Sequence, residues 1–218
     1  MSNIIIVESD ADKYFVEALL LNLNIKNAEV GLPICSISDY DCLGGFNNLE
    51  KRLKEVRFDK YEKIGIILDA DTDGIQKKVD FINDTFKTVC KDLVINNTCT
   101  MYKSIEIDIN VACYITNVNG YGELEDILMC IKSKESIYAD CLDSWKKCVE
   151  SKGKPVSTKE FNKFWVNNYL RLDTCKSAKH RGNKFKYCSQ SEESIKKNIW
   201  DFSKNELNDL KSFLNLFK

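Results

Sequence analysis

The chain has 218 residues, of which 44% are hydrophobic and 30% are charged, and its formal net charge is −1. No stretch approaches the roughly 20 consecutive apolar residues that a membrane-spanning helix needs, and no signal peptide is recognisable at the start. The composition is that of a soluble globular protein, and we expect it in the cytoplasm with no membrane partner.

The cysteines give no sign of a disulfide scaffold or of a zinc site. All ten occur singly, without a CxxC pair, and His180 is the single histidine. Disulfide scaffolds are shorter and rich in loops, and zinc sites show close Cys or Cys/His pairs. We therefore expect free thiols in a reducing compartment.

Residues 1–130 alternate between strand and helix patterns. The predicted strands are 3–7, 29–37, 63–68, 99–106 and 111–115. The predicted helices, each with apolar residues at helical spacing, are 11–23, 46–57 and 74–91. This alternation predicts an α/β fold of Rossmann-like type, with a mainly parallel sheet and helices on both faces.

Beyond Gly120 the pattern is helical, and we expect residues 131–218 to form a basic extension packed on a domain of residues 1–130. Ser157-x-x-Glu160 and Ser203-x-x-Glu206 both match a helix capping box, and Gly153-Lys154-Pro155 predicts a break between helices. Trp165 and Tyr169, four residues apart, are expected to lie in the core rather than to stack on bases.

Charge is distributed unequally along the chain. Residues 1–130 carry 13 Lys and Arg against 22 Asp and Glu, a net charge of −9, whereas residues 131–218 carry 19 against 11, a net charge of +8. One reading is that the basic half attracts a polyanion such as nucleic acid. The other is that each half solvates its own surface or attracts the other half. The first reading predicts phosphate contacts in the basic loop 176–186, from Lys179, Arg181, Lys184 and Lys186.

Carboxylates follow two of the predicted strands. Glu8 comes directly after strand 3–7, and the motif Asp69-x-Asp71-x-Asp73-Gly74 follows strand 63–68. Ligands of open α/β sheets sit beyond the carboxyl ends of the strands, and clustered carboxylates repel one another unless a cation neutralises them. Oxygen ligands of this kind suit Mg²⁺ or Mn²⁺.

A Glu after the first strand and a DxD after a later one resemble the Toprim domain of topoisomerases, bacterial primases and overcoming-lysogenization-defect nucleases. The resemblance implies that Asp69 and Asp71 hold metal and that Glu8 completes the metal shell or acts as general acid or base. Ser9 stands where that family usually has Gly. The three acids are the predicted catalytic set.

A further acidic motif, Gly120-Tyr-Gly-Glu123-Leu-Glu125-Asp126, follows strand 111–115. Together with the end of the chain around Trp200, it resembles a small stand-alone Toprim-like family of unknown function. The predicted metal set therefore also includes Asp73, Glu123 and Glu125. A role that needs no metal is open for each of these residues. Acids in the first turn of a helix interact favourably with the helix dipole, and Asp73 is expected to cap helix 74–91.

Other interpretations of the acids remain. The DxDxDG motif, with Asp80 in the twelfth place, matches much of an EF-hand loop, but a strand precedes it where an EF-hand has a helix. It also resembles motifs of haloacid-dehalogenase phosphatases and nucleotide-sugar glycosyltransferases. A supporting role at the site is open for Asp12 and Lys13, one turn past Glu8, but surface positions on helix 11–23 are favoured.

The sequence thus predicts a metal-dependent nuclease that hydrolyses phosphodiesters in DNA or RNA, in a defence or repair system. The alternative is a catalytically silent Toprim-fold protein that regulates or scaffolds a partner. Because the chain has no GxxxxGK[ST] loop, an ATPase partner would be a separate protein.

Overall fold

The structure is a computed structural model that describes residues 2–35, 47–175, 191–195 and 197–218. Its centre is a five-stranded sheet in the order β2-β1-β3-β5-β4. The strands are β1 (Ser2–Val7), β2 (Ala28–Val30), β3 (Tyr61–Asp69), β4 (Tyr102–Ser104) and β5 (Ile109–Thr116). All neighbours are parallel except β4, which runs antiparallel to β5 at one edge. The predicted α/β class with a mainly parallel sheet is confirmed.

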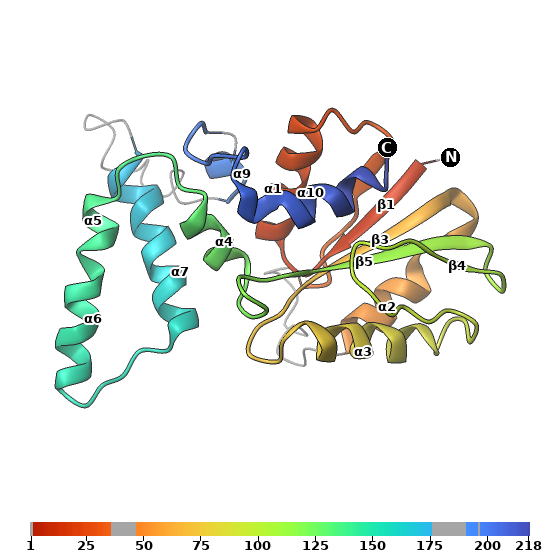
Figure 1. Ribbon diagram of the computed structural model, residues 1–218, viewed down its shortest axis with the longest axis horizontal. Helices are drawn as coiled ribbons and strands as arrows, with labels where there is room; N and C mark the ends of the chain where they lie inside the picture. The colour runs from red at the N-terminus through yellow and green to blue at the C-terminus, as the bar shows by residue number, and fades with distance from the viewer. Residues whose placement is uncertain (1, 36–46, 176–190, 196) are drawn as a thin grey trace.

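Helices cover both faces of this sheet and extend beyond one of its ends (Figure 1). α1 (Asp10–Asn22) and α10 (Asn208–Asn215) lie on one face, and α2 (Asn47–Glu55) and α3 (Ile75–Phe86) lie on the other. The remaining described α-helices are α4 (Leu124–Cys130), α5 (Ile137–Asp140), α6 (Leu142–Ser151), α7 (Thr158–Asn168) and α9 (Ser191–Ile195). Short helical turns are η2 (Phe58–Lys60), η3 (Tyr169–Asp173) and η5 (Asn205–Leu207).

Alternate side chains of the central strands enter two separate cores. In β1, Ile5 and Val7 join the core under α1 and α10, whereas Ile4 and Ile6 join the core over α2 and α3. Successive side chains of a strand point to opposite faces, so a strand that is apolar throughout must be covered on both sides. The two apolar layers fix the sheet and thereby the position of its carboxyl edge.

The C-terminal helix packs directly on the sheet. Phe213 and Phe217 are fully buried, and a Cβ atom on Gly65 of β3 would lie 2.7 Å from the ring of Phe217. Only glycine at this position allows so close an approach. Asn3 Nδ2 also donates to the Phe217 carbonyl at 3.1 Å, so the two ends of the chain lie side by side (Figure 1).

The proposed boundary at residue 130 stays a prediction. The core under α1 and α10 combines strand residues such as Ile5 with later residues such as Trp165, Leu210 and Phe213. The predicted core role of Trp165 and Tyr169 is confirmed, because both are buried and their rings stack with centroids 5.4 Å apart. The predicted break at residues 153–155 is also confirmed between α6 and α7.

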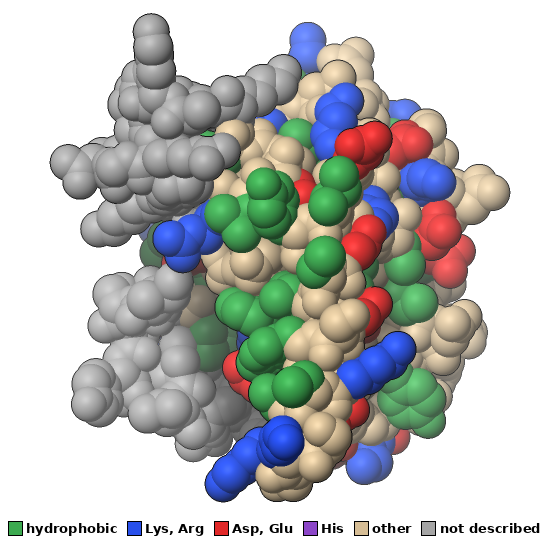
Figure 2. All heavy atoms as spheres, turned by 90° about the vertical axis from the view of Figure 1, so that its left-hand side faces the viewer, with side chains coloured by type: hydrophobic (Ala, Val, Ile, Leu, Met, Phe, Trp, Pro, Cys, Tyr) green, Lys and Arg blue, Asp and Glu red, His purple; other side chains and the backbone are tan. Residues whose placement is uncertain are grey.

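Helices α5, α6 and α7 form an arm beyond the carboxyl ends of the parallel strands (Figure 1). Figure 2 views this end of the molecule and shows hydrophobic side chains among scattered acidic and basic ones. Trp145 and Phe164 contribute exposed rings whose centroids are 5.3 Å apart. Within the described residues, no helix is long and apolar enough to cross a membrane.

Several predicted elements are shorter in the structure, for local reasons. β2 ends at Val30 because Pro33 has no N–H to donate to a ladder, although Ile34 and Cys35 still hydrogen-bond to Val7 and Glu8. Residues 36 and 37 lie outside the described part of the chain. β4 covers only residues 102–104 of the predicted 99–106, and α3 ends at Phe86 rather than at residue 91.

One further prediction is wrong, and another, that of free thiols, is confirmed for all but one of the cysteines that the structure describes in full. Ser203 caps no helix: its hydroxyl donates to Asp201 Oδ1 at 2.6 Å, and α10 begins only at Asn208. A serine hydroxyl that forms such a local hydrogen bond is not available to cap a helix. Cys175 is disulfide-bonded, whereas seven of the described cysteines are free thiols.

Candidate functional site

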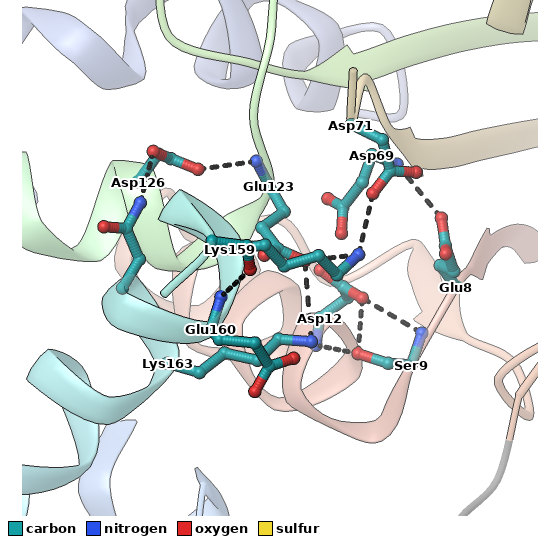
Figure 3. Close-up of polar contacts among 12 residues, drawn as sticks. Glu8, Ser9, Asp12, Asp69, Asp71, Glu123, Asp126, Lys159, Glu160 and Lys163 are labelled. Carbon is teal, nitrogen blue, oxygen red and sulfur yellow. Dashed lines mark hydrogen bonds and ion pairs between the residues drawn. The ribbon is translucent and has the colours of Figure 1, made fainter. Parts of the chain in front are cut away.

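Two adjacent strands bring Glu8 and Asp69 together at the carboxyl edge of the sheet. Val7 is the last residue of β1, Asp69 is the last residue of β3, and Val7 pairs with Ile67 in the ladder. The Asp69 N–H donates to Glu8 Oε2 at 3.1 Å (Figure 3). The predicted meeting of these two acids at one edge is therefore found in the structure.

Asp12 joins them, although the sequence placed it on the surface. It is only 4% exposed, and its Oδ2 accepts hydrogen bonds from the Ser9 N–H at 3.0 Å and from the Ser9 hydroxyl at 2.5 Å. Ser9 is the N-cap of α1 and Asp12 the third helical residue, which makes a capping box. Because α1 begins directly at the end of β1, its first turn faces the sheet edge.

No ion pair among the described residues joins Glu8, Asp12, Asp69 or Glu125 to a basic group, although Lys163 and Lys159 offset part of the charge of Glu125. Asp69 is 9% exposed, and its Oδ1 has no hydrogen-bond partner. We call these four residues the uncompensated acids.

Burial and repulsion by neighbouring carboxylates raise the pKa values of Asp12, Asp69 and Glu125. Burial raises the pKa of Asp12 to about 7, against the hydrogen bond from Ser9, and repulsion by Glu8 adds to the rise. Burial also raises the pKa of Asp69 well above its usual value, and repulsion by Asp12 and Glu8 adds to it. The pKa of Glu125 is raised by burial and by repulsion from Glu123, and Lys163 and Lys159 offset part of this rise. A low-dielectric cluster of like charges disfavours the ionised form in this way.

Asp71 lies in a different electrostatic environment. Its backbone has a φ of 48° and is held by two hydrogen bonds with Gly122, at 2.8 and 2.9 Å. Its carboxylate accepts from Lys78 Nζ at 2.7 Å and from Lys159 Nζ at 2.9 Å. Burial raises the pKa of Asp71, but the hydrogen bonds from both lysines outweigh this and lower the pKa overall.

Glu123 shares one of these lysines. It is the N-cap residue of α4, is 4% exposed, and lies 3.0 Å from Lys159 Nζ and 3.7 Å from Lys163 Nζ through Oε2. Its other oxygen, Oε1, has no hydrogen-bond partner. Its N–H donates to Asp126 Oδ2 at 2.8 Å, and Asn162 holds the other Asp126 oxygen at 2.7 Å.

Asp73 does not join the cluster. It is exposed and forms an ion pair with Lys77 at 3.2 Å. It does not cap α3 as expected, because Gly74 is the N-cap residue and no side chain caps the helix. The predicted phosphate contacts Lys179, Arg181, Lys184 and Lys186 lie outside the described residues. An EF-hand is excluded, since β3 precedes the DxDxDG motif.

Sequence reasoning missed the three lysines of this site. Lys159 and Lys163 stand four residues apart on α7, so they share one face of the helix, and Lys78 is buried at the start of α3. Asp71, the partner of Lys78 and Lys159, is 88 residues away from Lys159 along the chain. No local pattern signals such a pairing, whereas the capping box Ser9-x-x-Asp12 was readable in the sequence, although the burial of Asp12 was not.

A hollow of about 740 Å³ opens beside the lysine-paired acids. It lies between the loop after β3, the turn before α4 and the start of α7, and its lining includes Asp71, Tyr121, Glu123, Thr158 and Lys159. Pockets of roughly 300–1,000 Å³ are the usual size for small-molecule sites. A ligand of that size would contact the acids and Lys159 together.

The donor chemistry fits a hard divalent cation, but the donors are not assembled around one point. One carboxylate oxygen of Asp69 and one of Glu123 have no hydrogen-bond partner among the described residues. Mg²⁺ or Mn²⁺ would bind such oxygens and balance the uncompensated charge. Among the described residues, however, no group of three or more Asp, Glu, His or Cys side chains is arranged to hold a metal ion. Side chains would have to turn toward the cation as it binds.

Comparison with known proteins gives one match. The model of a family described as a protein of unknown function (DUF3226) matches residues 2–218. No curated protein and no solved structure matches the chain significantly. Because the match covers nearly the whole length, the chain belongs to the DUF3226 family of proteins of unknown function.

Proposed function

We propose that the protein is a Mg²⁺- or Mn²⁺-dependent nuclease of Toprim-like type, which hydrolyses phosphodiester bonds in nucleic acid. The observation that carries the proposal is the uncompensated carboxylate cluster at the carboxyl edge of a parallel sheet. Such a cluster costs stability on its own, because buried like charges repel one another. A cation that binds it offsets this cost by mass action. A cytoplasmic location and a role in defence or repair belong to the same proposal.

Asp69 and Glu8 would hold the cation, with Asp12 and Glu125 close enough to add to the negative potential. A divalent cation supplies charge neutralisation at the phosphate and activation of water. Glu8 is fixed by the Asp69 N–H through one oxygen, so its other oxygen is available to accept a proton from water. Lys159 provides positive charge at the edge of the hollow, and Lys163 adds positive charge next to Glu123.

A cleavage assay tests this proposal. The purified full chain is incubated with single- and double-stranded DNA and RNA, labelled at one end, in Mg²⁺, Mn²⁺ or EDTA. We expect cleavage that needs the metal and is lost in Asp69→Asn. Asp84→Asn is a matched control, because Asp84 is an exposed residue of α3 whose one ion pair within the described parts of the chain is with Lys87. Cleavage in EDTA, or undiminished cleavage by Asp69→Asn, would contradict the proposal.

The second candidate is a catalytically silent protein that regulates or scaffolds a partner, such as a separate ATPase. The ion pairs of Asp71 with Lys78 and Lys159 favour it, because they neutralise an acid that the DxD motif assigns to metal. If the wild-type protein binds nucleic acid but never cuts it with either metal, even with its genomic neighbour added, this second function replaces the first.

A further inference from the structure

Two acids of the site, Asp71 and Glu123, already have cationic partners. Lys159 Nζ lies 2.9 Å from Asp71 Oδ1 and 3.0 Å from Glu123 Oε2, so one ammonium group bridges the loop after β3 and the start of α4 (Figure 3). Lys163 approaches Glu123 at 3.7 Å. The lysines of α7 thus neutralise two carboxylates that border the uncompensated acids.

The lysines differ in their access to solvent. The side chain of Lys78 is only 11% exposed, which marks it as a fixed partner of Asp71. The side chains of Lys159 and Lys163 are 51% and 42% exposed, and Lys159 lines the 740 Å³ hollow beside Thr158. A phosphate group entering the hollow can therefore reach Lys159 without unfolding any element.

A divalent cation and an ammonium group compete for the same carboxylate oxygens. If the cation that Asp69 and Glu8 would hold also draws the carboxylates of Asp71 and Glu123 toward it, Lys159 loses both partners and is repelled by the cation. An ammonium group left without a carboxylate in a half-buried position binds phosphate well. The N-terminus of α7, an 11-residue helix that begins at Thr158, adds a favourable dipole for an anion.

We propose that Lys159, assisted by Lys163, exchanges partners: it neutralises Asp71 and Glu123 in the metal-free protein and binds a backbone phosphate of the nucleic acid once a divalent cation is bound. The inference rests on the proposed metal site and adds the phosphate-binding residues to it. Removal of the Lys159 charge then has two effects of opposite sign: metal binds more tightly, and nucleic acid binds more weakly. A residue with a merely structural role would weaken both.

The test uses Lys159→Met in the full chain. Mn²⁺ affinity is measured by calorimetry, and affinity for a phosphorothioate-linked single-stranded 20-mer is measured by fluorescence anisotropy in Mn²⁺ and in EDTA. We expect about three- to tenfold tighter Mn²⁺ binding. We also expect weaker oligonucleotide binding in Mn²⁺, with the log–log salt slope reduced by about 0.7, the value for one lost contact to a single strand. In EDTA the oligonucleotide affinity should hardly change.

Three further variants complete the design. Lys163→Met should give smaller changes in the same two directions, because its distance to Glu123 is longer. Lys159→Arg keeps the charge and should behave as the wild type. Lys147→Met, an exposed residue of α6 that forms no ion pair among the described residues, should leave both affinities unchanged.

The outcomes separate this inference from the proposed function. If the wild type binds Mn²⁺ and cuts nucleic acid, but Lys159→Met binds Mn²⁺ no more tightly or binds the oligonucleotide as well as before, the partner exchange is wrong and the nuclease proposal stands. If the wild type neither binds Mn²⁺ nor cuts, both proposals fall. Thermal melting of each variant in EDTA establishes that it is folded.

Discussion

At the scale of single residues, the acids of the carboxyl edge divide into two groups. Asp71 and Glu123 form ion pairs with lysines at hydrogen-bond distance. Asp69 and Asp12 are buried but have no such partner within the described residues. Ion pairing lowers a carboxyl pKa and burial without it raises the pKa, so neighbouring aspartates of one DxD motif must respond to mutation in opposite directions.

The first prediction compares Asp69→Asn with Asp71→Asn in EDTA. Asp69→Asn removes a buried unpaired charge and should raise the melting temperature by about 2–4 °C for each kcal/mol gained. Asp71→Asn leaves the buried Lys78 ammonium without its partner and should cost about 1–3 kcal/mol. Differential scanning fluorimetry measures both. Stabilisation by both variants would mean that the lysines do not neutralise Asp71.

The second prediction concerns pH. In the unfolded chain Asp12 titrates near 3.8, and in the folded protein its pKa is about 7. Between these values the folded state binds more protons, so the free energy of unfolding should fall as pH rises from about 4 to 7. Melting curves in EDTA across this range check the direction. Asp12→Asn should flatten the decline, and a melting temperature that climbs steadily from pH 5 to 7 would refute it.

At the scale of elements, the first turns of two helices and one tight turn position the side chains of the site. The first turn of α1 contributes Asp12, and the first turn of α4 contributes Glu123 and Asp126. The turn that leads into α4 needs glycine at two positions, since Gly120 has a φ of +94° and Gly122 a φ of +97°. Gly122 also holds Asp71 by two backbone hydrogen bonds. This turn therefore sets the distance between the two lysine-paired acids.

The third prediction compares Ala substitutions at these two glycines. A Cβ on Gly120 meets nothing within 4 Å, so Gly120→Ala should cost only the backbone strain, about 1–2 kcal/mol. A Cβ on Gly122 would lie 2.6 Å from Asp126 Oδ2. Gly122→Ala should therefore cost about 1–3 kcal/mol more, because Asp126 must release the N–H of Glu123. Urea unfolding measures both, and equal costs would contradict the steric argument.

At the scale of the whole molecule, residues from both ends of the chain pack into one hydrophobic core. Phe213 of α10 and Phe217, just beyond its end, pack against the sheet, and Lys63 Nζ donates to the Leu216 carbonyl at 2.8 Å. The same core continues to Trp165 and Tyr169 beneath the arm. Shared apolar burial couples these parts, so the arm that carries Lys159 should not unfold separately from the sheet that carries the acids.

The fourth prediction tests that coupling. All three tryptophans, Trp145, Trp165 and Trp200, lie in residues 131–218, so their fluorescence reports on that part, whereas far-UV circular dichroism reports on the whole chain. The two signals should give one coincident urea transition. Phe217→Ala should shift both by about 3–5 kcal/mol, and Phe164→Ala, an exposed residue, by less than about 1 kcal/mol. Separate transitions would argue for independent domains.

The sequence by itself determined the α/β class, the central strands and the position of Glu8 and Asp69 at strand ends. These features depend on local patterns: apolar runs of strand length, helical spacing, and acids at the turns that follow. The shortened β2 was also readable in principle, since Pro33 cannot donate to a ladder. The capping box that buries Asp12 stood in the sequence as well, but its burial depends on what the first turn of α1 faces.

Only the tertiary structure decided which charges meet. Lys159 and Lys163 come to Asp71 and Glu123 because α7 returns to the sheet edge. Lys78, on α3, is buried and also pairs with Asp71. Net charge along the chain could not distinguish these lysines from solvated ones, because the energy of an ion pair depends on distance and burial rather than on sequence separation. The division of the site into paired and uncompensated acids is therefore a property of the fold.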